Sequence, residues 1–225
     1  MIHQIPDVLT PEQLTKLRAL IDESPFEGGE RTAGYRARRV KDNLQMAPDA
    51  EYLDAIQKMV FQALVSNLAF RAAAMPRKFV LPMVSRYKPG MAYGAHIDNA
   101  IMGQRMGGLE RSDLSYTLFL TDPADYDGGE LTLWSPYGEQ RIKLQPGSLF
   151  LYPSTMLHMV SPVTRGERIA VVGWVESIVR DESKREILFD LNRVKTYLVD
   201  NHPDAPEADL ALKAYGNLMR KWADT

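Results

Sequence analysis

The residues best suited to carry chemistry are His96 and Asp98, which a single residue separates. On an extended strand, residues two apart point to the same face, so an imidazole and a carboxylate at this spacing can converge on one metal ion. The pair alone is weak evidence, because His-x-Asp also occurs on strands that bind no metal. A third candidate ligand, His158, lies on another strand-like segment, 148–160. Two histidines and one carboxylate form the set that holds non-haem Fe(II) on one face and leaves positions open for a cosubstrate and oxygen.

Arg168 is the first residue of an apolar run that continues to Val175. An arginine on a buried strand needs an anionic partner, and a dicarboxylate cosubstrate would supply one. Each candidate also has a simpler interpretation. His158 could be an ordinary core histidine, Arg168 could form a structural salt bridge, and Tyr87 could pack across a sheet.

The composition excludes several classes of site and of partner. There is no cysteine, so disulfides, thiolate zinc sites, iron–sulfur clusters and a cysteine nucleophile are excluded, and any metal must bind nitrogen and oxygen. A formal net charge of −2 gives no general electrostatic footprint for nucleic acid or an anionic membrane. The N-terminus lacks the apolar core of a signal peptide, and no apolar run is long enough to cross a membrane. We therefore expect a cytoplasmic protein with no nucleic-acid or membrane partner.

The region from residue 79 to 175 alternates short β-type runs with turns rich in glycine and proline. Helical segments between the runs are missing, and a parallel α/β sheet would need them, so the pattern favours a β-sandwich or a jelly-roll barrel. The expected strands are 79–87, 92–98, 114–120, 130–134, 140–144, 148–152, 157–160 and 168–175.

Helices are expected before this β region, where they should back the sheet. Thr10 is placed to cap the first helix, with Pro11 at its first position and Gln13 completing a capping box. A second helix is expected over residues 50–74, because apolar residues recur there at three- and four-residue steps. These residues are Leu53, Ile56, Val60, Leu64 and Leu68.

Two further helices are expected at the C-terminus, joined by a loop at 202–206. Their apolar faces are Ile187, Leu191, Val194 and Leu198 on one helix, and Ala211, Tyr215, Leu218 and Trp222 on the other. The pair either packs on its own domain or contributes to a homodimer interface. The fold class is therefore mainly β with flanking helices, with a principal domain over residues 1–178 and a helical extension over residues 179–225.

Three connecting segments receive specific interpretations. Residues 24–34 are polar and glycine-rich, which predicts a loop. The basic cluster at 36–41 is either a solvated edge strand or a surface that meets an anionic substrate. Residues 99–111 contain glycines and methionines directly after the candidate ligands, and they form either a mobile lid over the substrate entrance or an ordinary long connection.

Taken together, the motifs resemble a known enzyme family. The pattern Tyr87-x-x-Gly-x-x-Tyr-x-x-His96-x-Asp98 is followed by Gly-Gly-Glu-Leu at 128–131, Pro-Gly-Ser at 146–148, His158 and Arg168. This order and spacing resemble the prolyl-4-hydroxylase-like branch of the Fe(II)/2-oxoglutarate dioxygenases, and within it the bacterial PKHD-type hydroxylases. The resemblance covers nearly the whole chain. It implies a double-stranded β-helix, or jelly-roll, core.

The resemblance also implies a role for each candidate residue. His96, Asp98 and His158 would ligate Fe(II), Arg168 would bind the distal carboxylate of 2-oxoglutarate, and Tyr87 would hydrogen-bond this cosubstrate near the metal. Many relatives carry lysine where this chain has Arg168. Either cation serves, but arginine can contact a carboxylate with two hydrogen bonds.

The function implied by the resemblance is an O2-dependent hydroxylation that releases succinate and CO2. The substrate would be an unidentified small molecule or peptide, with L-ascorbate (vitamin C) as a further reductant and a link to iron homeostasis. Two other functions stay open at this point. One is a sensor that binds iron and 2-oxoglutarate without hydroxylase turnover, and the other is a cupin-like protein that uses zinc or manganese.

Overall fold

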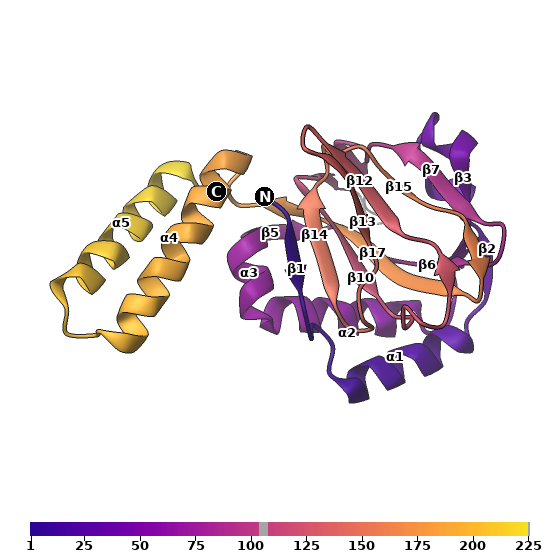
Figure 1. The fold of residues 1–225 in the computed structure, drawn as a ribbon, viewed down its shortest axis with the longest axis horizontal. Helices are drawn as coiled ribbons and strands as arrows, with labels where there is room; N and C mark the ends of the chain where they lie inside the picture. Colours follow the sequence, from indigo (N-terminus) through magenta and orange to yellow (C-terminus); the bar gives the residue numbers. More distant parts are fainter. Residues whose placement is uncertain (104–107, 225) are drawn as a thin grey trace.

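The chain folds around two β-sheets that face each other, and a computed structural model describes residues 1–103 and 108–224 (Figure 1). The larger sheet has the order β1-β14-β10-β17-β6-β4-β2, with β5 also paired to β17. The smaller sheet has the order β13-β12-β15-β7-β3. The pairs in both sheets are antiparallel, as expected of a jelly roll. The predicted fold class is confirmed by this arrangement and by the solved structures described below.

The strands are short, as the turn spacing predicts. Those of the larger sheet are β1 (His3–Ile5), β2 (Phe26–Gly28), β4 (Leu44–Met46), β5 (Pro76–Phe79), β6 (Met83–Tyr87), β10 (Leu114–Phe119), β14 (Leu149–Pro153) and β17 (Arg168–Ser177). Those of the smaller sheet are β3 (Lys41–Asp42), β7 (Ala92–His96), β12 (Leu131–Ser135), β13 (Gly138–Ile142) and β15 (His158–Val160). Two separate ribbons pair β8 (Ile101–Gly103) with β9 (Leu109–Arg111), and β11 (Asp127–Gly128) with β16 (Val163–Arg165).

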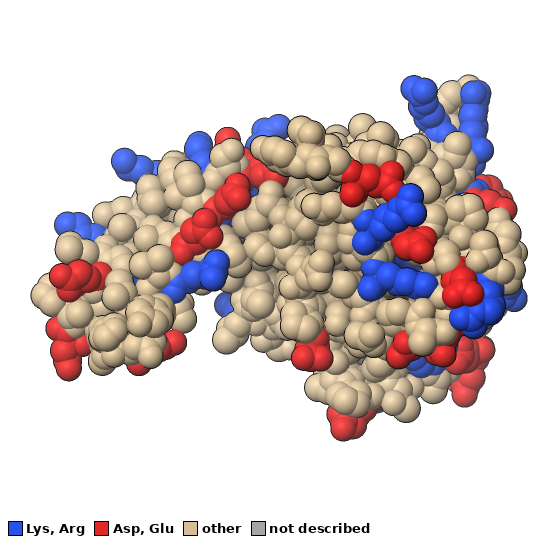
Figure 2. All heavy atoms as spheres, in the orientation of Figure 1, with Lys and Arg blue, Asp and Glu red and all other residues tan. Residues whose placement is uncertain are grey.

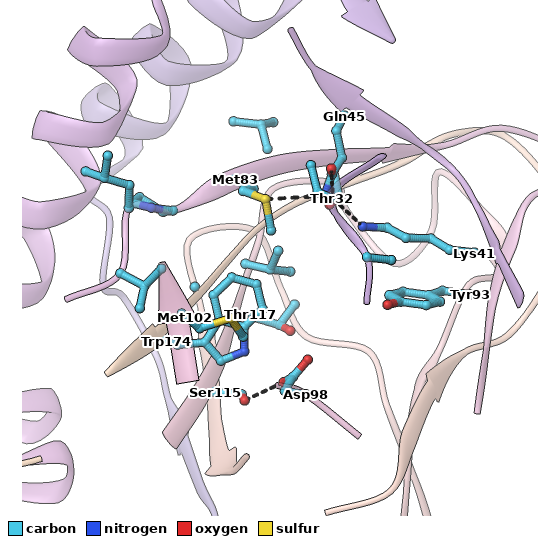
Figure 3. A pocket seen from close by; sticks show the side chains of 18 of the residues that line it. Thr32, Lys41, Gln45, Met83, Tyr93, Asp98, Met102, Ser115, Thr117 and Trp174 are labelled. Atoms are coloured by element: carbon cyan, nitrogen blue, oxygen red, sulfur yellow. Dashed lines mark hydrogen bonds between the residues drawn. The ribbon is translucent and has the colours of Figure 1, made fainter. Parts of the chain in front are cut away.

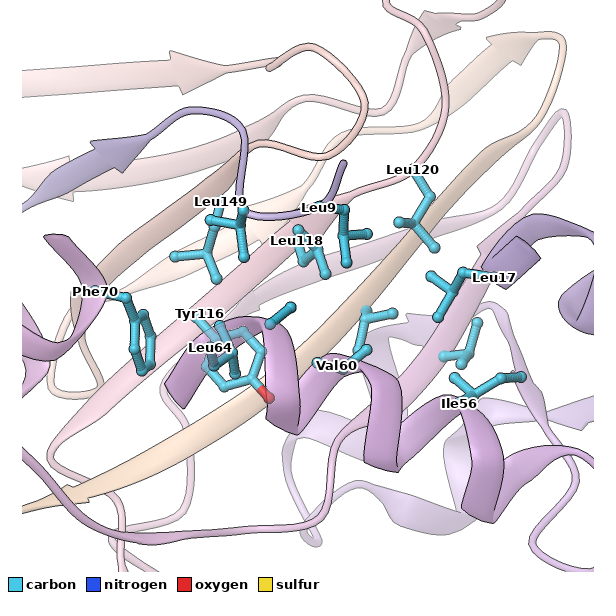
Figure 4. Packing of buried hydrophobic residues seen from close by; sticks show 14 of the residues in the cluster. Leu9, Leu17, Ile56, Val60, Leu64, Phe70, Tyr116, Leu118, Leu120 and Leu149 are labelled. Atoms are coloured by element: carbon cyan, nitrogen blue, oxygen red, sulfur yellow. The ribbon is translucent and has the colours of Figure 1, made fainter. Parts of the chain in front are cut away.

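Three helices cover the outer face of the larger sheet: α1 (Pro11–Asp22), α2 (Leu53–Ser66) and α3 (Leu68–Ala74). The predicted capping box at the start of α1 is confirmed, since the Thr10 side chain accepts a hydrogen bond from the Gln13 backbone and the Gln13 side chain accepts one from the Thr10 backbone. Side chains of α1 and α2 interleave with those of the sheet to form the main core (Figure 4). Each fully buried aliphatic side chain contributes about 1.5–3 kcal/mol, so this layer holds the larger sheet firmly in place.

The prediction of a single helix over residues 50–74 is wrong. It is two helices that break at Asn67, whose extended backbone (ψ 113°) leaves the helix while its side chain accepts a hydrogen bond from the Phe70 N–H. Asparagine favours this capping role over a helix interior because its side chain competes for backbone groups. Leu68, predicted to be buried, is 76% exposed as a result.

Other sequence boundaries also shift. The predicted loop at 24–34 contains β2 and a 3-10 turn, η1 (Gly29–Thr32), and the basic cluster forms a second 3-10 turn, η2 (Ala37–Val40), before β3. The predicted strand at 79–87 is divided between β5 and β6. The predicted lid consists, in its described part, of the paired strands β8 and β9. Residues 104–107 of that segment lie outside the described residues, so the lid stays a prediction.

The C-terminal helices α4 (Glu182–Asn201) and α5 (Pro206–Trp222) pack against each other as a hairpin that projects beside the β domain (Figure 1). The residue that anchors α4 is Leu188, which is fully buried with Val179. Two members of the predicted apolar face, Ile187 and Val194, are instead about half exposed, at 49% and 53%. No helix in the described part of the chain is both long and apolar enough to cross a membrane.

Candidate active site

The three predicted metal ligands come together between the two sheets. His96 ends β7 and His158 begins the adjacent strand β15, where the two residues are direct partners in the register. Asp98 lies just beyond β7 rather than on it, yet its carboxylate oxygens are 3.9 Å from His96 Nε2 and 3.7 Å from His158 Nε2. One ligand atom from each residue lies within 4.8 Å of the others. These three side chains can therefore reach a common ion.

The hydrogen bonds of both imidazoles leave the correct nitrogen free for a metal. His96 Nδ1 lies 2.8 Å from the Gly94 carbonyl, and His158 Nδ1 lies 2.9 Å from the Met156 carbonyl. A carbonyl oxygen only accepts, so each Nδ1 carries the proton and each Nε2, which faces Asp98, presents a lone pair. Burial, reinforced by the neighbouring His158, lowers the pKa of His96 to about 4, which keeps its imidazole neutral at pH 7.

The Asp98 carboxylate is oriented by the opposite sheet. Ser115, on β10, donates a hydrogen bond of 2.6 Å to Asp98 Oδ2, and its own hydroxyl lies 2.8 Å from that of Ser154 (Figure 3). Such outer-shell partners fix the direction of a ligand's lone pairs. The sequence did not reveal Ser115 or Ser154, because a serine within a buried strand looks like any small core residue.

The three side chains face a cavity of about 840 Å³ that reaches from the gap between the sheets to the surface. Arg168 also lines this cavity, at the start of β17, and is only 1% exposed. The centre of its guanidinium lies 5.2 Å from the ring centroid of Tyr87 and 5.4 Å from that of Phe119. Its Nε and Nη1 have no hydrogen-bond partner among the described residues. A buried cation with open donors on the wall of a cavity is a binding site for an anion.

Tyr126 adds another unsatisfied donor near this guanidinium. The side chain is fully buried, and its hydroxyl has no partner among the described residues. Burial raises the pKa of Tyr126 while the nearby Arg168 cation opposes the shift. Gly129 makes room for both residues, because a Cβ there would lie 3.1 Å from Arg168 Cδ and 3.1 Å from the Tyr126 ring. The Asp-Gly-Gly turn after Tyr126 is the sequence signal that could have revealed this arrangement.

The two tyrosines considered in the sequence occupy different places. Tyr87 is 3% exposed, is the register partner of Arg168 and lines the same cavity as the three candidate ligands. Burial raises the pKa of Tyr87 to about 12, which keeps its hydroxyl protonated. Tyr93 stacks on His96 with ring centroids 3.6 Å apart, so it packs against a candidate ligand.

Comparison with known proteins decides the family. The family model of the 2OG-Fe(II) oxygenase superfamily matches residues 82–176. A PKHD-type hydroxylase of Gloeothece citriformis is 44% identical to this chain over 224 residues, which cover 100% of both proteins. The chain belongs to the PKHD-type hydroxylases.

Two solved structures share the fold of this PKHD-type hydroxylase. A Pseudomonas putida prolyl-4-hydroxylase matches with a TM-score of 0.53 at 20% identity, over 78% of this chain and 92% of that chain. A prolyl hydroxylase from Trichoplax adhaerens, solved with a peptide fragment of the hypoxia inducible factor, matches with a TM-score of 0.53 at 20% identity, over 83% and 86% of the two chains.

This PKHD-type hydroxylase is accordingly a non-haem Fe(II)- and 2-oxoglutarate-dependent dioxygenase that uses O2 to hydroxylate a substrate. Its described residues fit these groups on physical grounds. Two imidazoles and one carboxylate are the nitrogen and oxygen donors that Fe(II) takes. The open donors of Arg168, which lines the same cavity, suit the distal carboxylate of 2-oxoglutarate.

Proposed function

We propose that His96, Asp98 and His158 are the iron ligands of this hydroxylase, and that Arg168 binds the distal carboxylate of 2-oxoglutarate. The observation that carries the proposal is the presence of both features in one cavity: a convergent ligand triad and a buried guanidinium with open donors. Tyr87, which lines the same cavity and packs against the guanidinium, hydrogen-bonds the cosubstrate near the metal.

Each residue then has a defined task. The Nδ1–H···O=C bonds hold the two imidazoles with Nε2 directed inward, and the Ser115 hydroxyl holds Asp98. Arg168 fixes one end of the cosubstrate, so that its other end lies toward the triad. Iron bound there would let O2 oxidise both molecules: one oxygen atom would enter succinate as 2-oxoglutarate loses CO2, and the other would enter the hydroxylated substrate. The protein orients the reactants and keeps bulk water away from them.

The experiment that tests the assignment measures O2 consumption and succinate release by the Fe(II)-loaded protein. Wild type should convert 2-oxoglutarate to succinate, at a rate that rises when a true substrate is added. Asp98→Ala should remove this turnover, whereas Asp127→Ala, which changes an exposed carboxylate paired with Arg165, should retain it. Turnover by Asp98→Ala equal to that of wild type would reject the triad, and a wild type that binds both groups without producing succinate would favour a sensor.

The proposal extends to the substrate class, the location and the oligomeric state of the protein. The substrate is a small molecule or a peptide, and the peptide alternative is supported by the peptide bound to the Trichoplax adhaerens prolyl hydroxylase. We further propose a cytoplasmic protein in which residues 179–225 form an extension to the catalytic domain and could pair two copies as a homodimer. Ascorbate as reductant and a role in iron homeostasis are proposals that follow from the family resemblance.

A further inference from the structure

Lys41 is a buried cation inside the active-site cavity that the proposed chemistry does not use. It begins β3, is 9% exposed and is the register partner of Tyr93 on β7. Its Nζ donates a hydrogen bond of 2.9 Å to Thr32 Oγ1 and lies 5.1 Å from the Tyr93 ring centroid (Figure 3). An ammonium group has three N–H donors, and this hydrogen bond uses one of them.

The charge of Lys41 is poorly compensated within the described residues. No carboxylate there lies within ion-pair distance of its Nζ, and the acidic groups that act on it from farther away are Asp98 and Glu30. Burial lowers the pKa of Lys41 to about 8, so at neutral pH the group is still mainly an ammonium. With iron and cosubstrate bound, the charges of Fe(II) and Arg168 balance those of Asp98 and the two carboxylates of 2-oxoglutarate, so Lys41 is left without an anion of its own. A buried charge in this position needs a mobile anion.

The wall opposite Lys41 is apolar, with one further hydrogen-bond donor. Met102 and Trp174 line the cavity across from Lys41 and Tyr93, and Met83 lines it between the two sides, next to Gln45 and Thr32 (Figure 3). The indole Nε1 of Trp174 is buried and has no partner among the described residues, and an indole can only donate. The open polar groups on the cavity wall are therefore donors at both sides, which suits a ligand that carries acceptors and an apolar body.

The surface beside Lys41 is also positively charged. Arg36, Arg38 and Arg39 are exposed on and next to η2, whose residue Ala37 lines the cavity. Figure 2 shows basic side chains projecting from this part of the molecule, at the upper right. Such a rim raises the local concentration of anions at the cavity mouth.

We propose that the substrate of this hydroxylase carries a carboxylate that binds Lys41, and an apolar segment that lies along Met83, Met102 and Trp174. The proposal rests on the function proposed above, because it assigns the substrate class to that same site. The carboxylate belongs either to a free organic acid or to a peptide, and both sources present the same group to Lys41.

The test uses the full-length protein loaded anaerobically with Fe(II) and 2-oxoglutarate. Straight-chain carboxylates of four to ten carbons are titrated in and compared with the amides and the ammonium ions of the same length, with calorimetry and the visible absorption of the iron complex as readouts. A second series compares short apolar tripeptides that end in a carboxylate with the same tripeptides ending in an amide. We expect one carboxylate series to bind about thirtyfold more tightly than its amides. The series that binds identifies the source of the carboxylate.

Variants then assign this preference to Lys41. Lys41→Met should bind carboxylates and amides equally, Lys41→Arg should keep part of the preference, and Lys58→Met, an exposed position on α2 outside the cavity, should behave as wild type. The affinities for Fe(II) and 2-oxoglutarate should be the same in all four proteins.

Three results would overturn the inference. In the first, no carboxylate of either series binds better than its amide; in the second, Lys41→Met keeps the preference for carboxylates. In the third, Lys41→Met lowers the affinity for 2-oxoglutarate as much as the affinity for the carboxylate probes. The last result would assign Lys41 to the cosubstrate. If wild type instead fails to bind Fe(II) and 2-oxoglutarate at all, the proposed function itself is wrong, so the two failures are distinguishable.

Discussion

Replacing Arg168 with methionine should weaken 2-oxoglutarate binding far more than iron binding. The guanidinium is 1% exposed, and two of its nitrogens have no partner among the described residues, so a bound carboxylate would form a fully desolvated, charge-assisted pair. Truncating one member of such a pair costs about 2–5 kcal/mol. This free energy corresponds to roughly a 30-fold to several-thousand-fold rise in the dissociation constant. Methionine keeps much of the side-chain volume, so the packing against Tyr87 and Phe119 is largely retained.

The same replacement should affect the stability of the apoprotein in the opposite direction. Without 2-oxoglutarate, Arg168 is an uncompensated buried charge, and a well-packed apolar side chain of similar volume is commonly neutral or stabilising by about 1–4 kcal/mol at such a site. Arg168→Met should therefore unfold at an equal or higher urea concentration than wild type while it binds 2-oxoglutarate poorly. This combination separates loss of an anion site from misfolding.

The assay is an anaerobic titration of the Fe(II)-loaded protein with 2-oxoglutarate, followed by the visible absorption of the complex, with iron affinity measured separately. Arg168→Lys should retain part of the binding because it keeps the charge. Arg165→Met is the matched control, since Arg165 forms an ion pair with Asp127 on the exposed surface, where such pairs contribute little. If folded, iron-binding Arg168→Met bound 2-oxoglutarate as tightly as wild type, the assignment of the guanidinium would be refuted.

Three further predictions concern the triad and Lys41. His96→Ala should lose stoichiometric iron while keeping the far-UV circular dichroism of wild type, and iron analysis after gel filtration checks this. Ser115→Ala should weaken iron binding by about 10–100-fold, because Asp98 loses the donor that orients it, whereas Ser112→Ala, whose hydroxyl donates to the Asn99 carbonyl, should not. For Lys41, burial lowers the pKa from its usual 10.5 to about 8, so between these values the unfolded state holds the extra proton and this lysine adds stability to the metal-free protein as pH rises. Lys41→Met should lack this gain of about 2 kcal/mol, measured by urea unfolding at pH 7.5 and pH 10.

The sequence predicted the candidate site well because its signals are local. His96 and Asp98 are two residues apart, and the strand pattern around each histidine predicted a β-segment there; that the two strands, β7 and β15, are neighbours is shown by the structure alone. Arg168 was found because a charged residue at the start of a long apolar strand is unusual. The capping box at Thr10 was equally readable, since it depends on residues only three apart.

Features that depend on contacts between distant segments could not be predicted. Ser115 orients Asp98 only because β10 of one sheet faces the end of β7 in the other, and Tyr126 reaches the guanidinium only because Gly129 leaves space for it. Lys41 was grouped with its arginine neighbours as one basic cluster, yet it alone points into the cavity, because the chain changes from a 3-10 turn to a strand at that residue. Periodicity within one segment carries no information on these pairings.

The proposed site residues come from both sheets, so the packing between the sheets sets the geometry of the site. The smaller sheet carries His96 and His158, whereas the larger sheet carries Arg168 and the serine that orients Asp98. The distance between the iron ligands and the cosubstrate anchor is therefore set by the packing of side chains between the sheets, including Phe119, Leu131, Leu133, Ile142, Phe150 and Tyr152. A cavity made in this cluster should disturb the geometry between iron and 2-oxoglutarate without touching either group. A change of similar size in the core between the larger sheet and its helices should reduce stability and leave that geometry intact, because both sets of anchors lie on the other side of the sheet.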